Sequence, residues 1–187
     1  AEHVKAAEVL DLGSRRELFV DRTLIDKLDG LRLELGRPVS AGVAVKYDRP
    51  WEGPVSFYTT VFQDGERFRM YYRGISKYGP DGSEHERTCV AESPDGKTWT
   101  KPELGLFEFA GNRSTNIVLA DAAPVTHNFS PLIDTKPGIP AEQKYKAIGG
   151  TGKALFAYGS ADGLRWTKLV DRPVIGPEQM TFKYSHL

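Results

Sequence analysis

Short apolar runs alternate with polar turn clusters along most of the chain, a pattern that is typical of β-strands. Runs rich in Val, Phe, Tyr and Thr cover Val55–Phe62 and Arg67–Ile75, with Asp64-Gly65 between them. Asp-Gly between two such runs predicts a tight hairpin, because glycine accepts the positive φ angle of the favoured turns. A third strand is expected at Glu86–Glu92 and a fourth from about Lys97, which completes a four-stranded antiparallel meander.

One motif occurs twice. Ser93–Lys101 returns as Ser160–Lys168, with Ser, Asp, Gly, Trp, Thr and Lys in the same order. In such a turn the Asp carboxylate accepts backbone amides, Gly adopts the left-handed conformation and Trp packs back over the sheet. We therefore assign Asp95 and Asp162 to turn architecture and expect each copy to join the last two strands of a sheet.

The segment before the second copy repeats the order of strands seen before the first. Strands are predicted at Phe129–Ile133, Tyr145–Gly149 and Ala154–Tyr158. The connection Asp134–Glu142 replaces the tight Asp-Gly turn with a longer loop that its prolines stiffen. The chain thus carries the same four-stranded unit twice.

A four-stranded sheet that repeats along a chain is typical of a β-propeller, in which each blade packs against its neighbours. We predict an all-β fold class: a β-propeller of four-stranded antiparallel blades, with two to two-and-a-half blades present. Residues 1–50 would form an extension with an early strand at Leu31–Leu35, residues 51–110 blade one, and residues 126–175 blade two. A closed ring needs at least about four blades, so the single domain 1–187 is interpreted as part of a ring. The alternative is a complete β-sandwich of the same strands.

Charge and composition limit the classes of partner that the chain is expected to bind. The 25 basic and 25 acidic side chains cancel, so no net field attracts nucleic acid or an anionic membrane, and a neutral partner such as a sugar fits better. No apolar run reaches the roughly 18 residues that span a bilayer. The single cysteine, Cys89, is interpreted as a buried structural thiol. A start at Ala1 is consistent with a secreted or periplasmic mature chain, or with a boundary introduced by cloning.

Three stretches carry a resemblance to known proteins: Val61–Gly74, the two Ser-x-Asp-Gly-x-x-Trp motifs and His127–Asp134. They resemble the five-bladed β-propellers of the arabinanase, levansucrase and invertase group, especially the glycoside hydrolase-like bacterial relatives. The resemblance covers about residues 45–175 and implies a carbohydrate site in a central funnel. The paired turns also resemble the Asp-boxes of sialidases.

The resemblance implies catalytic carboxylates on the first strand of each blade, because glycosidic cleavage needs one acid and one nucleophile or base. Residue by residue, the expected aspartate of blade one falls on Tyr58 and that of blade two on Ser130. The third carboxylate, the general acid, has no assignable position. Whether the chain is an enzyme therefore stays open.

Polar groups where the innermost strand of each blade begins are the candidate sugar-binding residues. Glu52 is a weak candidate acid or base if Trp51 desolvates it; the alternative is a solvated loop glutamate. Trp51 itself would be a stacking platform or a packing residue. The full candidate set is Trp51, Glu52, Tyr58, Arg73, His127, Asn128 and Ser130.

Three of these residues have specific alternatives. Arg73 would bind an acidic sugar or form a structural ion pair with an acid. His127 would transfer a proton, bind a metal or donate to a sugar hydroxyl, and the alternative is a structural histidine. Asn128 would contact a sugar hydroxyl.

Two functions follow as hypotheses: a glycoside hydrolase-like protein that binds or cleaves glycans in the funnel, or a non-catalytic propeller module that binds carbohydrate or protein. No Cys or His cluster with zinc spacing is present, so no metal site and no cofactor is predicted, and a calcium ion in the funnel is left open. Exposed blade edges would favour self-association.

Overall fold

The computed structural model describes residues 10–179. The chain divides into two compact units, Ala1–Ala41 and Gly42–Leu187. Residues 10–41 of the first unit form turns and extended segments without a helix or strand. The strand expected at Leu31–Leu35 is therefore wrong. Alternating leucines need a neighbouring strand to pair with, and here the three leucines are 74%, 47% and 94% exposed.

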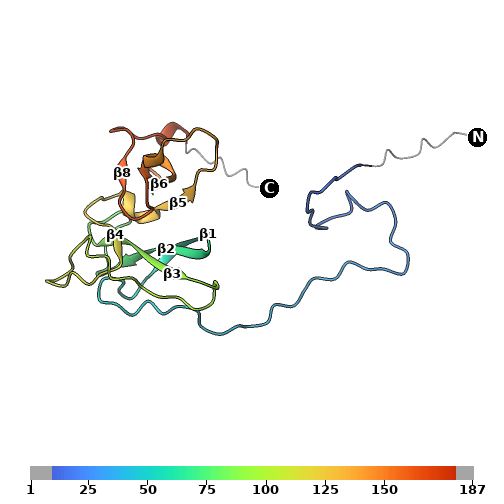
Figure 1. Ribbon diagram of the computed structural model, residues 1–187, viewed down its shortest axis with the longest axis horizontal. Helices are drawn as coiled ribbons and strands as arrows, with labels where there is room; N and C mark the ends of the chain where they lie inside the picture. The colour runs from blue at the N-terminus through green and yellow to red at the C-terminus, as the bar shows by residue number, and fades with distance from the viewer. Residues whose placement is uncertain (1–9, 180–187) are drawn as a thin grey trace, which may run out of the picture. The chain divides into compact units, whose positions relative to one another are not determined.

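The first sheet of the second unit has four antiparallel strands, which lie side by side in chain order. Figure 1 labels them. They are β1 (Phe57–Asp64), β2 (Arg67–Ile75), β3 (Glu86–Ser93) and β4 (Ile117–Leu119). The predicted tight turn is confirmed: β1 and β2 pair up to Asp64 and Arg67, and the intervening Gly65 has a φ angle of 65°.

The fourth strand of this sheet differs from the prediction. Thr100 pairs with Glu92 as an isolated bridge, close to the position expected from Lys97. The chain then leaves the edge of β3 and returns only at β4, which pairs with Thr88 and Cys89. Residues 101–116 are thus an insertion that interrupts the fourth strand, and its first residue has a role in the candidate site.

A second four-stranded antiparallel sheet repeats the arrangement. It comprises β5 (Ser130–Ile133), β6 (Tyr145–Thr151), β7 (Ala154–Ser160) and β8 (Thr167–Lys168). Among residues 10–179 the only helical segments are three short 3-10 helices: η1 (Val125–Asn128), η2 (Ala141–Gln143) and η3 (Pro177–Gln179). The all-β prediction is confirmed at this level, as are the three predicted strands and the longer loop before β6.

Both copies of the repeated motif form the predicted turn. In each, the aspartate accepts the backbone amides two and three positions later. These hydrogen bonds lower the pKa of Asp95 well below its ordinary value. Burial opposes the charge of Asp162, but the same kind of bonds outweigh it and lower its pKa to about 2. Gly96 and Gly163 have φ angles of 72° and 74°, as the left-handed position requires.

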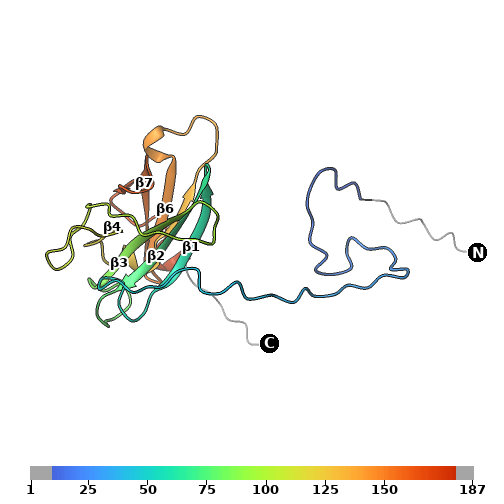
Figure 2. The same ribbon diagram turned by 60° about the horizontal axis from the view of Figure 1, so that its bottom comes forward.

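The two sheets lie beside each other (Figure 2). The second copy of the motif packs on the first sheet. Leu164 and Trp166 from that copy pack on Tyr71, Val90 and Val118 of the first sheet. At the opposite edge of the sheets, β1 contacts β5.

Hydrogen bonds fix the second turn against the first sheet. The buried Arg69 Nη1 donates to the Asp162 carbonyl at 2.6 Å, and the Tyr71 hydroxyl donates to the Gly163 carbonyl at 2.8 Å. A Cβ atom on Gly163 would lie 2.2 Å from Arg69 Nη1 and 2.7 Å from the Tyr71 hydroxyl, whereas one on Gly96 would lie no closer than 3.7 Å to its neighbours. Gly163 is thus required for close approach as well as for its φ angle.

We predict that Gly163→Ala destabilises the protein more than Gly96→Ala. Both changes place an alanine at a similar positive φ angle, which costs about 1 kcal/mol, and only Gly163→Ala adds a clash with buried, hydrogen-bonded side chains, worth about 1–3 kcal/mol more. Urea unfolding of the two variants and the parent measures the difference. Equal losses would mean that the second turn is not docked on the first sheet.

Candidate functional site

The candidate residues on and around β2 lie in two groups on opposite faces of that strand. Successive side chains of a strand point to opposite sides of its sheet, so Tyr72 and Arg73 have different surroundings. Tyr72 lies with Trp51 and Glu52, whereas Arg73 contacts His127. These five residues therefore form two separate clusters.

Glu52 is fully buried and is the centre of the first cluster. Its Oε2 accepts hydrogen bonds from Lys101 Nζ at 2.7 Å and from the Arg49 amide at 2.8 Å, and its Oε1 accepts one from the Tyr72 hydroxyl at 2.5 Å. A buried carboxylate requires such donors because it has lost its hydration. The alternative of a solvated loop glutamate is wrong, and both oxygens that an acid or base would use are engaged.

Neighbouring groups keep this carboxylate in place. Burial raises the pKa of the Tyr72 hydroxyl far above its ordinary range, and the charge of Glu52 adds to the shift, so the hydroxyl stays a donor. Asn116 donates to the Tyr72 oxygen and to the Val90 carbonyl, both at 2.7 Å. The insertion in the fourth strand thus supplies Lys101 at its beginning and Asn116 at its end.

Trp51 is a packing residue in this structure. Its side chain is buried, and its indole Nε1 donates to the Asn116 side-chain oxygen at 2.7 Å. The ring packs with Met70 and Cys89 in the core of the first sheet. Cys89 is buried as predicted, and burial raises the pKa of its thiol, which suits an inert structural role.

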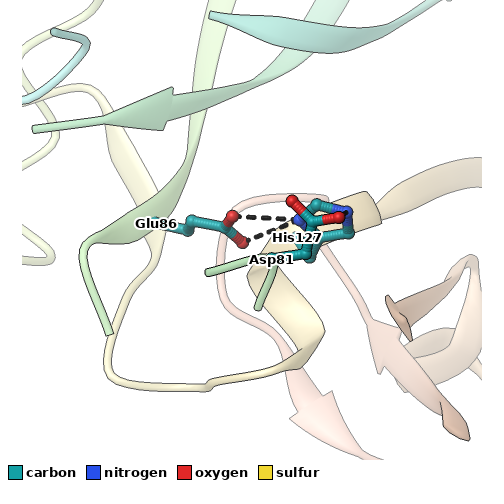
Figure 3. A group of neighbouring side chains, drawn as sticks. All are labelled: Asp81, Glu86 and His127. Carbon is teal, nitrogen blue, oxygen red and sulfur yellow. Dashed lines mark hydrogen bonds and ion pairs between the residues drawn. The ribbon is translucent and has the colours of Figure 1, made fainter. Parts of the chain in front are cut away.

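The second cluster is centred on the ring of His127, which lies at the end of the loop between the two sheets (Figure 3). Nδ1 lies 2.9 Å and 3.2 Å from the two carboxylate oxygens of Glu86, and 2.8 Å from Arg73 Nη1. Arg73 Nη1 also lies 3.5 Å from Glu86 Oε1, which in addition accepts the Gly82 amide at 3.3 Å. Arg73 therefore has the acidic partner that the structural alternative required.

Tyr58 covers this cluster. β1 pairs with β2 at Phe57 and again at Thr60, and the irregularity between them is a β-bulge that contains Tyr58. Tyr58 has a φ angle of 54°, a left-handed conformation that is unusual for a bulky residue. Its ring lies 4.5 Å from the Arg73 guanidinium carbon and contacts the His127 ring edge-on at 5.3 Å between centroids. Bulges of this kind often re-aim a side chain beside a site.

Asn128 and Ser130 continue the chain from His127 into β5. Asn128 is exposed, and the Ser130 hydroxyl, which is partly buried, donates to its side-chain oxygen at 3.4 Å. Of the seven candidates, the structure places Tyr58, Arg73 and His127 in direct contact. Asn128 follows His127 in the chain. Trp51 and Glu52 belong to the other cluster.

Asp81 and Glu86 were not predicted from the sequence. Asp81 Oδ2 lies 3.7 Å from His127 Nε2, and together with Glu86 these residues offer three ligand-type atoms within 4.8 Å of one another. The register of the sheet places Glu86 near Arg73, because Arg73 pairs with Thr88 and a residue two positions from Thr88 lies diagonally on the same face. The sequence pattern does not give this register. Asp81 is on the loop between β2 and β3, where no periodicity locates a side chain.

Comparisons with known proteins add little. No protein-family model matches the chain, and no curated protein matches it. A crystal structure of an N-acetylgalactosamine deacetylase from F. plautii, in complex with blood group B trisaccharide, is similar at 18% sequence identity with a TM-score of 0.43. The match covers 63% of this chain and 30% of that one, so the chain spans less than a third of that protein.

No helix among residues 10–179 is long and apolar enough to cross a bilayer.

We predict that Lys101→Met lowers the free energy of unfolding by about 3–5 kcal/mol, because it leaves the Glu52 carboxylate buried without its cation. Lys97→Met, at an exposed position in the preceding turn, is the matched control and should change stability by less than about 0.5 kcal/mol. Chemical denaturation followed by tryptophan fluorescence measures both. Equal stability of the two variants would contradict the central position given to Glu52.

Proposed function

We propose that this chain is the carbohydrate-binding part of a glycoside hydrolase-like β-propeller, and that it binds a neutral glycan over Tyr58. The observation that carries the proposal is the exposed ring of Tyr58, held in a left-handed backbone conformation and fixed by Arg73 and His127. Backbone strain of about 1–3 kcal/mol persists where surrounding contacts enforce it, commonly at binding sites. A fixed, exposed aromatic ring binds the apolar face of a sugar at low entropic cost.

The surroundings of Tyr58 suit a neutral ligand. Phe57 is 56% exposed beside it, and the exposed Asn128 offers an amide to hydroxyl groups. Arg73 is buried and paired with Glu86, so it is not free to pair with the carboxylate of an acidic sugar. This leaves stacking and neutral hydrogen bonds as the means of recognition.

Features of the two sheets support a propeller. Both have the strand order of a blade, their first strands are in contact, and the turn at the outer end of the second sheet docks on the first sheet. Blade one would extend beyond the predicted 51–110 to include β4, and blade two would cover 126–175. Leu132 and Ile148, exposed by 52% and 40%, would be covered by a further blade or by self-association.

Binding without cleavage is favoured within this proposal. The positions that correspond to catalytic aspartates carry Tyr58 and Ser130, neither of which is a carboxylate. Glu52, the weak candidate for an acid or base, is buried and holds three donors.

A glycosidase remains the second candidate because Asp81 and Glu86 form a close carboxylate pair. Retaining glycosidases hold two carboxyl groups about 5 Å apart. Glu86, however, is 2% exposed and is bonded to Arg73 and His127, so a substrate would reach only Asp81. The pair therefore lacks the access to substrate that a catalytic dyad needs.

The test is binding of neutral oligosaccharides to the full chain. We expect Tyr58→Phe to retain affinity for the arabino- or fructo-oligosaccharide that binds best, and Tyr58→Ala to reduce it about 3- to 10-fold, since aromatic contacts are worth about 0.5–1.5 kcal/mol. Isothermal titration calorimetry measures the affinity. Tyr78→Ala removes another exposed tyrosine and serves as the control.

The proposal fails if the folded chain binds no member of a broad panel of neutral oligosaccharides. It also fails if Tyr58→Ala binds as well as Tyr78→Ala, because recognition would then not involve the ring of Tyr58. Release of reducing sugar from the bound oligosaccharide would favour the glycosidase.

A further inference from the structure

The ring of His127 lies between two carboxylates. Nδ1 is 2.9 Å from Glu86 Oε1, and Nε2 is 3.7 Å from Asp81 Oδ2 (Figure 3). The His127 side chain is 9% exposed, yet its Nε2 makes no hydrogen bond to residues 10–179. The carboxylate of Asp81 is exposed, and its contact with His127 Nε2 is the one ion pair that it forms with residues 10–179.

The protonation of Nδ1 decides what Nε2 presents to Asp81. An ionised carboxylate only accepts hydrogen bonds and a guanidinium only donates them, so Nδ1 cannot serve both Glu86 and Arg73. A bare Nδ1 would face the carboxylate at 2.9 Å and 3.2 Å, with two repulsive contacts. A protonated Nδ1 has one poor contact, with Arg73 Nη1 at 2.8 Å. That contact is relieved by a small movement of the guanidinium, whose bonds to Glu86 and to the His127 carbonyl are long, at 3.5 Å and 3.4 Å.

When Nδ1 carries the only ring proton, Nε2 has a free lone pair, and Asp81 Oδ2 is the carboxylate oxygen that lies near it, at 3.7 Å. Two acceptors then lie 3.7 Å apart without a donor between them, and a shared cation would satisfy both. The distance is less than the sum of two metal–ligand bonds of about 2.1 Å, so one ion can bind both atoms. A histidine that donates its other nitrogen to a carboxylate is the usual arrangement of a metal-binding histidine.

We propose that His127 Nε2 and Asp81 bind a divalent transition-metal ion, with Glu86 as the outer carboxylate that orients the ring. An imidazole ligand favours zinc over calcium or magnesium, and the carboxylate beside it also suits manganese. Arg73 lies on the Nδ1 side of the ring and balances the charge of Glu86, which leaves the charge of Asp81 for the ion. Two protein ligands leave further positions for water or for a hydroxyl group of a ligand.

The experiment titrates the metal-free full chain with Zn²⁺ and Mn²⁺ at neutral pH by isothermal titration calorimetry, without any glycan. We expect one ion per chain. Asp81→Asn should weaken binding at least 10-fold, and Glu86→Gln should weaken it about 10- to 100-fold, as loss of an outer partner does. Glu84→Gln, an exposed carboxylate on the same loop, is the matched control and should bind like the parent.

The proposal is overturned if neither ion binds more tightly than about millimolar, or if Asp81→Asn binds as the parent does, which would place the ion elsewhere. Asp81 is exposed, so its variant tests the site without disturbing the core; circular dichroism and the Mn²⁺ electron paramagnetic resonance signal check folding and ligation separately. Since no sugar is present, this outcome is independent of glycan binding at Tyr58.

Discussion

The buried carboxylate of Glu52 is the constraint around which the first sheet is organised. A charge without hydration must be matched by donors inside the protein, and its donors come from three places in the chain: the segment before β1, the middle of β2 through Tyr72, and the insertion through Lys101. Trp51 and Asn116 close the same network. The insertion in the fourth strand is thus tied to the sheet by the charge that it neutralises.

Side chains alternate between the two faces of β2, so the buried Glu52 network and the proposed binding site lie on opposite faces of the strand. Tyr72 faces the Glu52 network, while Arg73 faces the loop that carries His127. Arg73 engages Glu86, His127 and the ring of Tyr58 at once, so one buried cation connects β1, β2, β3 and the loop between the sheets. A surface aromatic ring is thereby held by groups that are themselves buried, which is the support that a rigid binding surface requires.

Local signals in the sequence predicted the local features well. Asp64-Gly65 forms its tight turn, both Ser-x-Asp-Gly motifs form theirs, and the strands of the second sheet lie within a few residues of their expected bounds. Features that depend on distant partners were not predictable. The leucines of 31–35 have the alternation of a strand but pair with no strand among residues 10–179. β4 lies beyond an insertion, and Glu86 joins His127 across 41 residues. Register and long-range pairing are set by tertiary contacts that a pattern does not contain.

The docking of the second turn gives the two copies of the motif different tolerance to substitution. Gly96 and Gly163 occupy the same place in two nearly identical motifs and have nearly the same φ angle, yet only Gly163 touches a neighbouring sheet. Asparagine, which tolerates the left-handed conformation, is compatible with the first position and excluded from the second. Two motifs of nearly identical sequence therefore tolerate different substitutions at the same position.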